Sequence, residues 1–373
     1  MNKTPPSSAW QPTIRVGMPL PSGELLQYGV ASGLPMLMSA NAFARVNARR
    51  EFVGFNLAAA RAIPQHVDCA LDSAGFVAAS HFGDYRWSVD AYLDLAASRD
   101  WAFYSSMDYC VEPQVAPDAA TRRLRVDATI ARYFQCAHRA AQRGMQAPLP
   151  VIQGYFASEY AYCAEALAIG KDTRMVGIGS VCRRHLHGPD GLIAIMDALD
   201  RVLPPDTVCH LFGAKGSALP ALQQAGLAHR VGSTDSMAYD MACRRAMPVG
   251  RTQLMRARAM VDWHARETRQ LAERATRAAV LPCVASERRR DVMEVATEAV
   301  GAALGELHGS NDVEYLKASH LAAHDVYVVT ALLRTQGVEA FEQEEPEDDY
   351  GLGVVYQGVR EALVEAGYLA VTA

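Results

Sequence analysis

Long apolar runs are missing from this sequence of 373 residues. No segment is an uninterrupted apolar stretch long enough to cross a bilayer. Residues 1–11 are polar and rich in Pro and Ser, without the apolar centre of a signal peptide. We therefore expect a cytoplasmic protein without a membrane partner.

Paired cysteines are missing as well. No two cysteines have the CxxC spacing of redox and zinc sites, and their scatter argues against a disulfide framework. We expect reduced and mostly buried thiols. The eight residues are Cys69, Cys110, Cys136, Cys163, Cys182, Cys209, Cys243 and Cys283.

An excess of positive charge is missing too, since the formal net charge is −5. This balance argues against a protein that coats nucleic acid nonspecifically, because such binding depends on Lys and Arg neutralising phosphates. The charge is uneven, however: arginines far outnumber acids in residues 244–290, and residues 339–349 are acidic. An acidic total can therefore conceal a basic face.

Short apolar runs alternate with helical stretches, which is typical of parallel βαβ units. The composition, 50% hydrophobic and 21% charged, fits a globular protein. We predict strands at 34–38, 67–71, 101–107, 149–153, 174–178, 207–212 and 229–234. We predict helices at 40–63, 88–97, 118–143, 158–169, 191–202, 219–224 and 236–245.

Seven such units are one short of a (β/α)₈ TIM barrel, which leaves a doubly wound sheet as the alternative. No GxGxxG turn follows the first strand, and polar residues recur at strand ends, where a barrel builds its active site. We favour an α/β TIM barrel over residues 1–250. Residues 251–373 are predicted to form a C-terminal helical appendage that packs on the barrel and contributes a basic face, with helices at 252–279, 287–307, 315–335 and after Gly351.

The first chemical motif follows the predicted strand 67–71 and reads Asp72-Ser73-Ala74-Gly75-Phe76. A strand-end carboxylate followed by small residues lets the backbone approach a flat ligand. Asp72 and Ser73 as simple helix caps are the alternative.

The second motif places Asp108 after the strand 101–107, with Cys110 and Pro113 close behind. A buried carboxylate here can accept hydrogen bonds from the N–H edge of a purine-like base, and such a site discriminates strongly. A plain loop residue is the alternative.

The third motif is Gln153-Gly154 at a strand end, followed by Gly177 and Gly179 around the next one. The Gln amide offers a donor and an acceptor to a base edge, and glycines leave room for a planar ring. Turn glycines and a solvating Gln are the alternative interpretation.

The fourth motif is Thr234-Asp235-Ser236 at the end of the seventh predicted strand. The small neighbours leave the carboxylate accessible, so Asp235 is the candidate nucleophile. It can also simply cap the helix that follows.

These motifs, in this order over about residues 34–245, resemble the tRNA-guanine transglycosylase superfamily. The family's Asp-Ser-Gly-Gly-Phe motif is similar to the stretch from Asp72 to Phe76, and its nucleophile motif is similar to that around Asp235. The resemblance implies that Asp235 is the nucleophile and Asp72 the general acid/base. It assigns base binding to Ser73, Phe76, Asp108, Gln153, Gly154, Gly177 and Gly179.

Two departures narrow the resemblance. The family's zinc site needs three cysteines and a distal histidine, but only Cys283 lies in the matching region, although His320 is similar in place to the family's histidine. A four-coordinate structural zinc is therefore not expected. The segment from Gly179 to Arg184 also differs from the tRNA enzymes. Together with the surroundings of Asp235 it looks more like the 7-deazaguanine DNA transglycosylases of the DpdA type.

The resemblance implies a pentosyltransferase without a cofactor. It would exchange a flipped-out guanine in DNA for a 7-deazaguanine base, such as 7-cyano-7-deazaguanine, through a covalent aspartyl-glycosyl intermediate. Phosphate contacts are expected from Arg183, Arg244 and Arg245. The alternatives are a tRNA-guanine transglycosylase and a noncatalytic nucleic-acid-binding barrel with companion modification proteins. Metal-dependent hydrolysis is disfavoured because the histidines form no HExxH pattern.

Overall fold

The computed structural model describes residues 11–280 except 183, 189, 215, 217 and 248, together with residues 359, 360, 362 and 363. Residues up to 281, apart from 186–188, form one compact unit, which contains every element discussed below. Of the helix predicted after Gly351, only residues 359, 360, 362 and 363 are described, and they are helical. The other helices predicted beyond residue 281, the acidic run, Cys283 and His320 lie outside the described ranges, as does Arg183.

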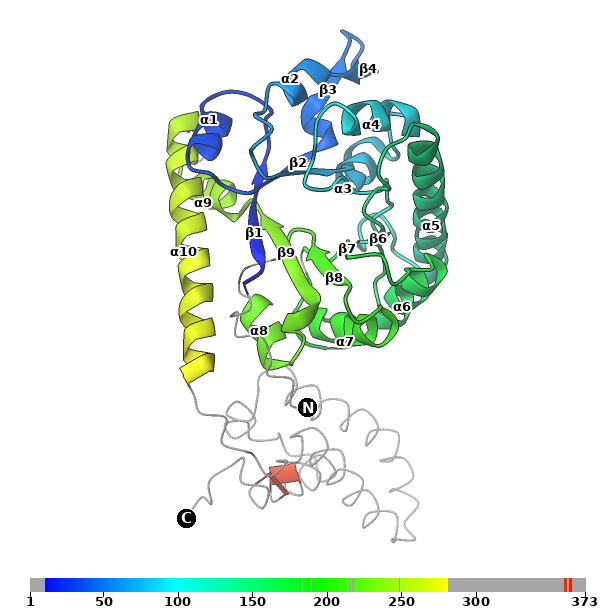
Figure 1. Ribbon diagram of the computed structural model, residues 1–373, viewed down its shortest axis with the longest axis vertical. Coiled ribbons are helices and arrows are strands. Elements are labelled where there is room, and N and C mark those ends of the chain that lie inside the picture. The colour runs from blue at the N-terminus through cyan, green and yellow to red at the C-terminus, as the bar shows by residue number, and fades with distance from the viewer. Residues whose placement is uncertain are drawn as a thin grey trace, which may run out of the picture. The chain divides into compact units, whose positions relative to one another are not determined.

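A curled parallel sheet forms the centre of this unit, and Figure 1 shows helices around it. The strand order is β5-β2-β1-β9-β8-β7-β6, with all neighbours parallel. Such a sheet is buried on both faces, which explains the apolar runs in most of its strands; β9, with the sequence VGSTDS, is the exception. The strands are β1 (Thr13–Met18), β2 (Met36–Ser39), β5 (Cys69–Asp72), β6 (Val151–Ile152), β7 (Met175–Ile178), β8 (Val208–Leu211) and β9 (Val231–Ser236).

A short extended segment, residues 102–106, lies between the two edge strands of this sheet. On one side, the backbone N–H of Leu71 donates to Phe103 O and that of Ser105 donates to Leu71 O, each at 2.9 Å. On the other side, the N–H of Leu149 donates to Tyr104 O at 2.8 Å, just before β6. Residues on both edges therefore form backbone hydrogen bonds with the same segment.

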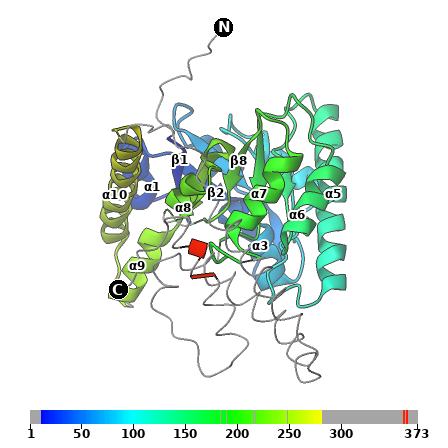
Figure 2. The same cartoon turned by 90° about the horizontal axis from the view of Figure 1, so that it is seen from below.

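Helices connect the parallel strands on the outside, and Figure 2 shows α5, α6 and α7 on one side of the strands and α1 and α10 on the other. Several begin at capping residues: Ser88 accepts from Ala91 N–H, and Asp118 from Thr121 N–H. The helices are α1 (Glu24–Ala31), α2 (Leu57–Arg61), α3 (Gly75–Val77), α4 (Val89–Ala96), α5 (Ala119–Gln142), α6 (Ala157–Ala166), α7 (Leu192–Val202), α8 (Ala218–Gln224), α9 (Ala238–Ala246) and α10 (Gln253–Val280).

The α/β class is confirmed, and the predicted helices from α4 onward agree with the observed ones to within a few residues. The sequence interpretation missed β1, which occupies the middle of the sheet. The helix predicted at 40–63 was wrong: the chain there forms a 3₁₀ turn, then an antiparallel hairpin of β3 (Ala44–Val46) and β4 (Phe52–Phe55), and only then the short helix α2. The aromatic and β-branched residues of 43–55 favour the hairpin over the alanines around them.

The helix α10 packs against α1, α9 and β1. Its His264 Nε2 lies 3.0 Å from Ile14 O of β1, and its Arg256 binds Asp240 of α9 at 2.6 Å. No helix in the described ranges, α10 included, is both long and apolar enough to span a membrane. The division into domains 1–250 and 251–373 stays a prediction.

Candidate active site

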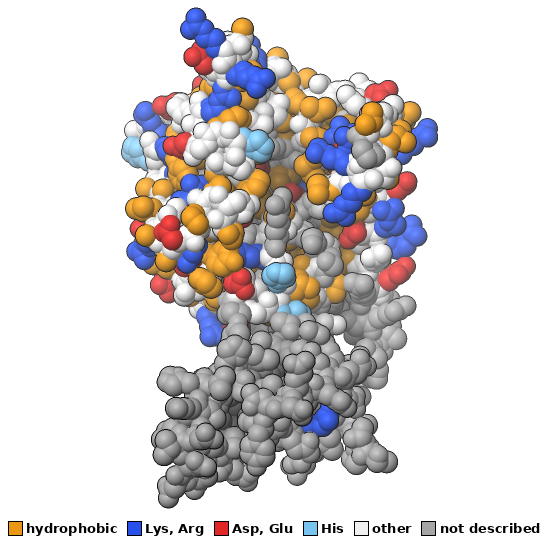
Figure 3. Space-filling view, turned by 180° about the vertical axis from the view of Figure 1, so that it is seen from behind, with side chains coloured by type: hydrophobic (Ala, Val, Ile, Leu, Met, Phe, Trp, Pro, Cys, Tyr) orange, Lys and Arg blue, Asp and Glu red, His pale blue; other side chains and the backbone are white. Residues whose placement is uncertain are grey.

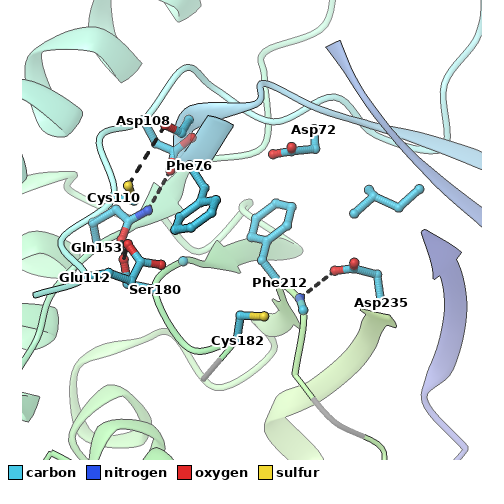
Figure 4. Close-up of a pocket in the computed structure, with 14 residues that line it drawn as sticks. Asp72, Phe76, Asp108, Cys110, Glu112, Gln153, Ser180, Cys182, Phe212 and Asp235 are labelled. Carbon is cyan, nitrogen blue, oxygen red and sulfur yellow. Dashed lines mark hydrogen bonds between the residues drawn. The ribbon is translucent and has the colours of Figure 1, made fainter. Parts of the chain in front are cut away.

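One pocket of about 220 Å³ gathers residues from the C-terminal ends of β2, β5, β7, β8 and β9 and from the segments after residue 106 and after β6. This size is below the ~300–1,000 Å³ of clefts for drug-sized ligands and suits a single heterocyclic base. Figure 4 shows its residues. The side chains used below are those of Asp72, Phe76, Asp108, Glu112, Gln153, Ser180, Phe212 and Asp235, all of which line the pocket.

Asp72 is the last residue of β5 and lines the pocket, and a strained turn follows it in the chain. The turn residue Ala74 has φ 71°, a left-handed conformation that costs energy for any residue with a Cβ. In return, the Ala74 N–H donates to Asp72 Oδ2 at 3.1 Å. Burial, followed by the nearby carboxylates of Asp108 and Asp235, raises the pKa of Asp72 from 3.8 to about 7. Asp72 therefore exchanges a proton readily near neutral pH.

Asp108 is held at the opposite side of the pocket by three side chains. Its Oδ1 accepts from Ser73 Oγ at 2.7 Å, and its Oδ2 accepts from Gln153 Nε2 at 2.6 Å. Tyr85 bridges to the same place, because its hydroxyl accepts the Asp108 N–H at 3.0 Å. Burial raises the pKa of Asp108, while the hydrogen bonds from Ser73 and Gln153 act against that rise. Asp108 Oδ2 keeps a lone pair for a ligand, whereas Oδ1 also lies 3.5 Å from the Tyr85 hydroxyl.

Gln153 continues this hydrogen-bonded row toward Ser180. Its Oε1 accepts from Ser180 Oγ at 2.7 Å, and the same hydroxyl lies 3.1 Å from Glu112 Oε2. A Cβ on Gly179 would meet Gln153 Nε2 at 2.1 Å, so only glycine permits this amide position. Because the acceptor Asp108 fixes the amide orientation, Gln153 still has one N–H hydrogen for a ligand.

Asp235 lies near the end of β9, with one oxygen anchored. Its Oδ1 accepts the Gly213 N–H at 2.7 Å and lies 3.5 Å from His210 Nε2. The His210 ring is fully buried, and its Nδ1 lies 2.8 Å from Ser233 Oγ. Burial lowers the pKa of His210, against the opposing effect of Asp235, which favours a neutral imidazole. The other oxygen, Oδ2, has no hydrogen bond within the described residues.

Two aromatic rings separate these groups. Phe76 and Phe212 lie in the middle of the pocket, with Asp108 and Gln153 on one side and Asp72 and Asp235 on the other (Figure 4). The Phe76 side chain is 37% exposed although it is large and apolar. A planar base lying against these rings would extend from the row around Asp108 to the pair of carboxylates.

The structure brings most predicted site residues together, with two exceptions among the glycines. Asp72, Phe76, Asp108, Gln153, Gly179 and Asp235 line the pocket, and Ser73 supports Asp108 from behind. Gly154 and Gly177 do not line it: a Cβ on Gly154 would meet Tyr160 N at 2.7 Å, and one on Gly177 would meet the Phe212 ring at 2.5 Å. Both glycines therefore make room for protein atoms. Gly177 still shapes the pocket through Phe212.

The arginines predicted to contact phosphates are only partly described. Arg244 forms an ion pair with Asp240 at 3.0 Å. Asp240 is buried and also binds Arg256. Arg245 is exposed on α9. The structure describes nothing of Arg183.

Sequence reasoning missed Tyr85, Glu112, Ser180, His210 and Phe212. Ser180 lies in the segment from Gly179 to Arg184, and Glu112 lies between Cys110 and Pro113 of the second motif. Their positions next to predicted site residues could have marked them as candidates. Ser180 also has φ 53°, a strained backbone typical of functional sites but invisible in a sequence. His210 and Phe212, with Leu211 between them, fit the pattern of an ordinary buried strand.

Metal ligation has no candidate in the part of the chain that the structure describes: no three His, Cys, Asp or Glu side chains there are grouped to hold an ion. Cys283 and His320 lie outside that part. The expected absence of a structural zinc therefore stays a prediction.

Comparison with known protein families matches most of the chain to one family model. The family model DpdA, described as DeoxyPurine in DNA protein A, matches residues 31–305. No curated protein sequence matches. Among solved structures, the chain is similar to the Mg complex of β-methylaspartase from Clostridium tetanomorphum, with 12% identity and a TM-score of 0.41. That similarity covers 72% of this chain and 61% of the other, so the chain spans less than two thirds of its length.

Proposed function

The chain belongs to the DpdA family, whose members are associated with modified purines in DNA, and we propose that it exchanges guanine in DNA for a 7-deazaguanine base. The observation that carries this proposal is the single pocket lined by Asp72, Asp108, Gln153 and Asp235. Two of these carboxylates lie on one side of the aromatic rings, and the amide and third carboxylate lie on the other (Figure 4).

The row around Asp108 reads the base in this proposal. Guanine and 7-deazaguanines share an edge with N–H donors beside a carbonyl acceptor, which complements the carboxylate of Asp108 and the free amide hydrogen of Gln153. Adenine lacks those donors and would leave Asp108 buried without a partner. Such a mismatch costs about 1–3 kcal/mol or more for a charged group.

Asp235 is the nucleophile and Asp72 the acid/base catalyst. The target nucleotide leaves its stack and enters the pocket, at a cost of a few kcal/mol. Asp235 Oδ2 forms a bond to C1′ while the bond from C1′ to guanine breaks, and the proton of Asp72 goes to the departing guanine. Asp72, now a carboxylate, takes the N9 proton of the incoming base. That nitrogen then displaces Asp235 from C1′, so the configuration is retained over two displacements.

The environments of the two carboxylates support these roles. Asp72, with a pKa of about 7, is available in both protonation states near neutral pH. Asp235 receives the Gly213 N–H on one oxygen, which keeps the second oxygen directed for attack. His210 is a positioning residue in this scheme, because its imidazole contacts the anchored oxygen of Asp235.

We also propose that residues 102–106 complete a (β/α)₈ barrel as its eighth strand. Backbone hydrogen bonds to Leu71 on one side and Leu149 on the other support this interpretation. Asp108 then lies just after the end of a strand, while Asp72 and Asp235 lie at or near the ends of theirs. All three carboxylates thus reach the face where barrel enzymes place their chemistry.

Capture of the covalent intermediate tests the mechanism. The protein is incubated with guanine-containing DNA without an incoming base, denatured, and separated by mass. We expect a DNA–protein adduct that maps to Asp235 and disappears in Asp235→Ala. An adduct of wild-type yield in that variant would exclude Asp235 as the nucleophile.

Asp240→Ala is not a useful control because Asp240 supports two arginines. Asp206→Ala is better, because it changes an exposed aspartate outside the pocket. This variant should form the adduct as the wild type does. Asp72→Ala should retain base binding while exchange weakens.

A further inference from the structure

The β3–β4 hairpin, residues 44–55, has no part in the chemistry proposed above but begins beside the pocket. It follows β2 by only the four residues of the 3₁₀ turn Ala40–Phe43, and the last residue of β2, Ser39, is paired with Asp72. In Figure 1 the hairpin projects at the top, beyond the ring of helices. The hairpin therefore starts on the face of the strand ends and extends away from it.

An aromatic cluster fixes the base of the hairpin. The Phe52 and Phe55 rings lie 4.9 Å apart, and Trp87 lies 5.3 Å from Phe55. Trp87 in turn contacts Tyr85 at 5.6 Å, and the Tyr85 hydroxyl binds the backbone of Asp108. Packed side chains thus connect the hairpin to the hydrogen-bonded row of Asp108, Gln153 and Ser180, so the hairpin has a fixed position relative to this row.

The loop at the tip is rigid as well. The side chain of Asn47 accepts the N–H groups of Arg49 and Glu51 at 3.0 and 2.9 Å, and its own amide donates to Glu51 Oε2 at 2.8 Å. Arg50 has φ 61°. These contacts hold Glu51, the one acidic side chain of the loop, against Asn47.

Arg45, Arg49 and Arg50 are all exposed, and none forms an ion pair or side-chain hydrogen bond within the described residues. Val46 and Val53 beside them are 49% and 53% exposed. Elsewhere on the described surface many arginines have carboxylate partners, such as Arg123, Arg143 and Arg201. Figure 3 shows Lys and Arg side chains on the projection at the top of the molecule.

We propose that this hairpin is a docking element for duplex DNA next to the flipped nucleotide. The inference rests on the proposed function for the nature of the substrate. A two-stranded β-ribbon fits the major groove of B-DNA, and unpaired arginines in its strand β3 (Arg45) and at its tip (Arg49 and Arg50) complement the phosphates. The ribbon would hold the duplex while the target base occupies the pocket.

The dimensions agree with this role. The three residues of β3 extend about 10 Å at about 3.3 Å per residue. One DNA strand advances about 3.4 Å per nucleotide. Arg49 and Arg50 at the tip would therefore meet phosphates roughly three or more nucleotides from the target, where the duplex is still paired, and Arg45 would meet phosphates nearer to it.

Salt dependence of DNA binding tests the proposal. The test variant carries Arg45→Gln, Arg49→Gln and Arg50→Gln, which remove the charges and keep the side-chain length. Between about 50 and about 200 mM salt, each phosphate contact contributes a factor of about 3.5 to the loss of affinity, so three contacts contribute about 40-fold. For labelled duplex, the loss of affinity between these two salt concentrations should be about 40-fold smaller for the variant than for the wild type. The dissociation constant for free 7-cyano-7-deazaguanine should be the same in both proteins.

The matched control replaces three exposed basic residues far from the strand ends that line the pocket by Gln: Lys171 and Arg174 just before β7, and Arg201 near the end of α7. It should keep the wild-type salt dependence. Equal salt dependence in the hairpin variant and the wild type would overturn the proposal, and so would a change seen with tRNA but not with duplex DNA. A wild-type protein that binds DNA through the hairpin but never exchanges a base would contradict the proposed function alone.

Discussion

Replacement of Asp72 by Asn should stabilise the protein and strongly slow base exchange. The Asn side chain keeps the size of Asp72 and can still accept the Ala74 N–H, but it carries no charge. In the wild type, the folded state raises the pKa of Asp72 from 3.8 to about 7 because the carboxyl is buried near Asp108 and Asp235. Ionisation of Asp72 at high pH therefore destabilises the folded state relative to the unfolded chain.

The expected size follows from this pKa. At about 1.4 kcal/mol for each tenfold change in proton affinity, a rise from 3.8 to about 7 corresponds to about 4 kcal/mol. Asp72 is partly exposed, so solvent screening reduces the value, and we expect about 1–2 kcal/mol. The folded protein keeps a proton that the unfolded chain releases from about pH 4 upward. The free energy of unfolding contributed by Asp72 therefore falls as pH rises from about 4 to 7 and is constant above.

Chemical denaturation at about pH 5 and about pH 8 checks this prediction. The free energy of unfolding of Asp72→Asn should exceed that of the wild type clearly at the higher pH and much less at the lower one. The same variant should exchange the base much more slowly than the wild type at either pH, because Asn holds no transferable proton. A variant less stable than the wild type at pH 8, or a difference independent of pH, would refute the reasoning about the Asp72 environment.

Three further changes test other parts of the site. Gly179→Ala should weaken binding of the free base about tenfold, because the new Cβ displaces the Gln153 amide; calorimetry showing unchanged affinity would contradict this. His210→Phe should slow single-turnover exchange about tenfold without changing base affinity, because the anchored oxygen of Asp235 loses its imidazole contact; an unchanged rate would remove its positioning role. Elemental analysis should find no stoichiometric zinc, because Cys283 has no cysteine neighbours in its region; one zinc per chain would disprove this.

The sequence carried most of the information about the base-reading and catalytic residues. Asp72, Asp108, Gln153 and Asp235 all stand at or just after the ends of buried segments, and a parallel sheet brings such ends to one face. Their convergence in one pocket therefore follows from the alternation of short apolar runs with helical stretches in the sequence. Their contacts were not predictable, because they depend on side chains from other strands.

Some features were hidden by residues that contradict the usual patterns. The strand β1 contains Arg15, a charge in a buried strand, which is tolerated because its guanidinium binds Asp68 at 2.6 Å and lies over the Phe103 ring. The hairpin lies in an alanine-rich stretch that resembles a helix. Phe212 belongs to no motif, and its place in the pocket depends on the absence of a side chain at Gly177.

The central claim, base exchange in DNA through Asp235, is tested most directly by offering radiolabelled 7-cyano-7-deazaguanine with guanine-containing DNA and with tRNA in parallel. The wild type should incorporate label into DNA. Asp235→Asn should incorporate none while it still binds the free base, which shows that the pocket is intact. Incorporation confined to tRNA, or incorporation into DNA by Asp235→Asn at the wild-type rate, would contradict the claim.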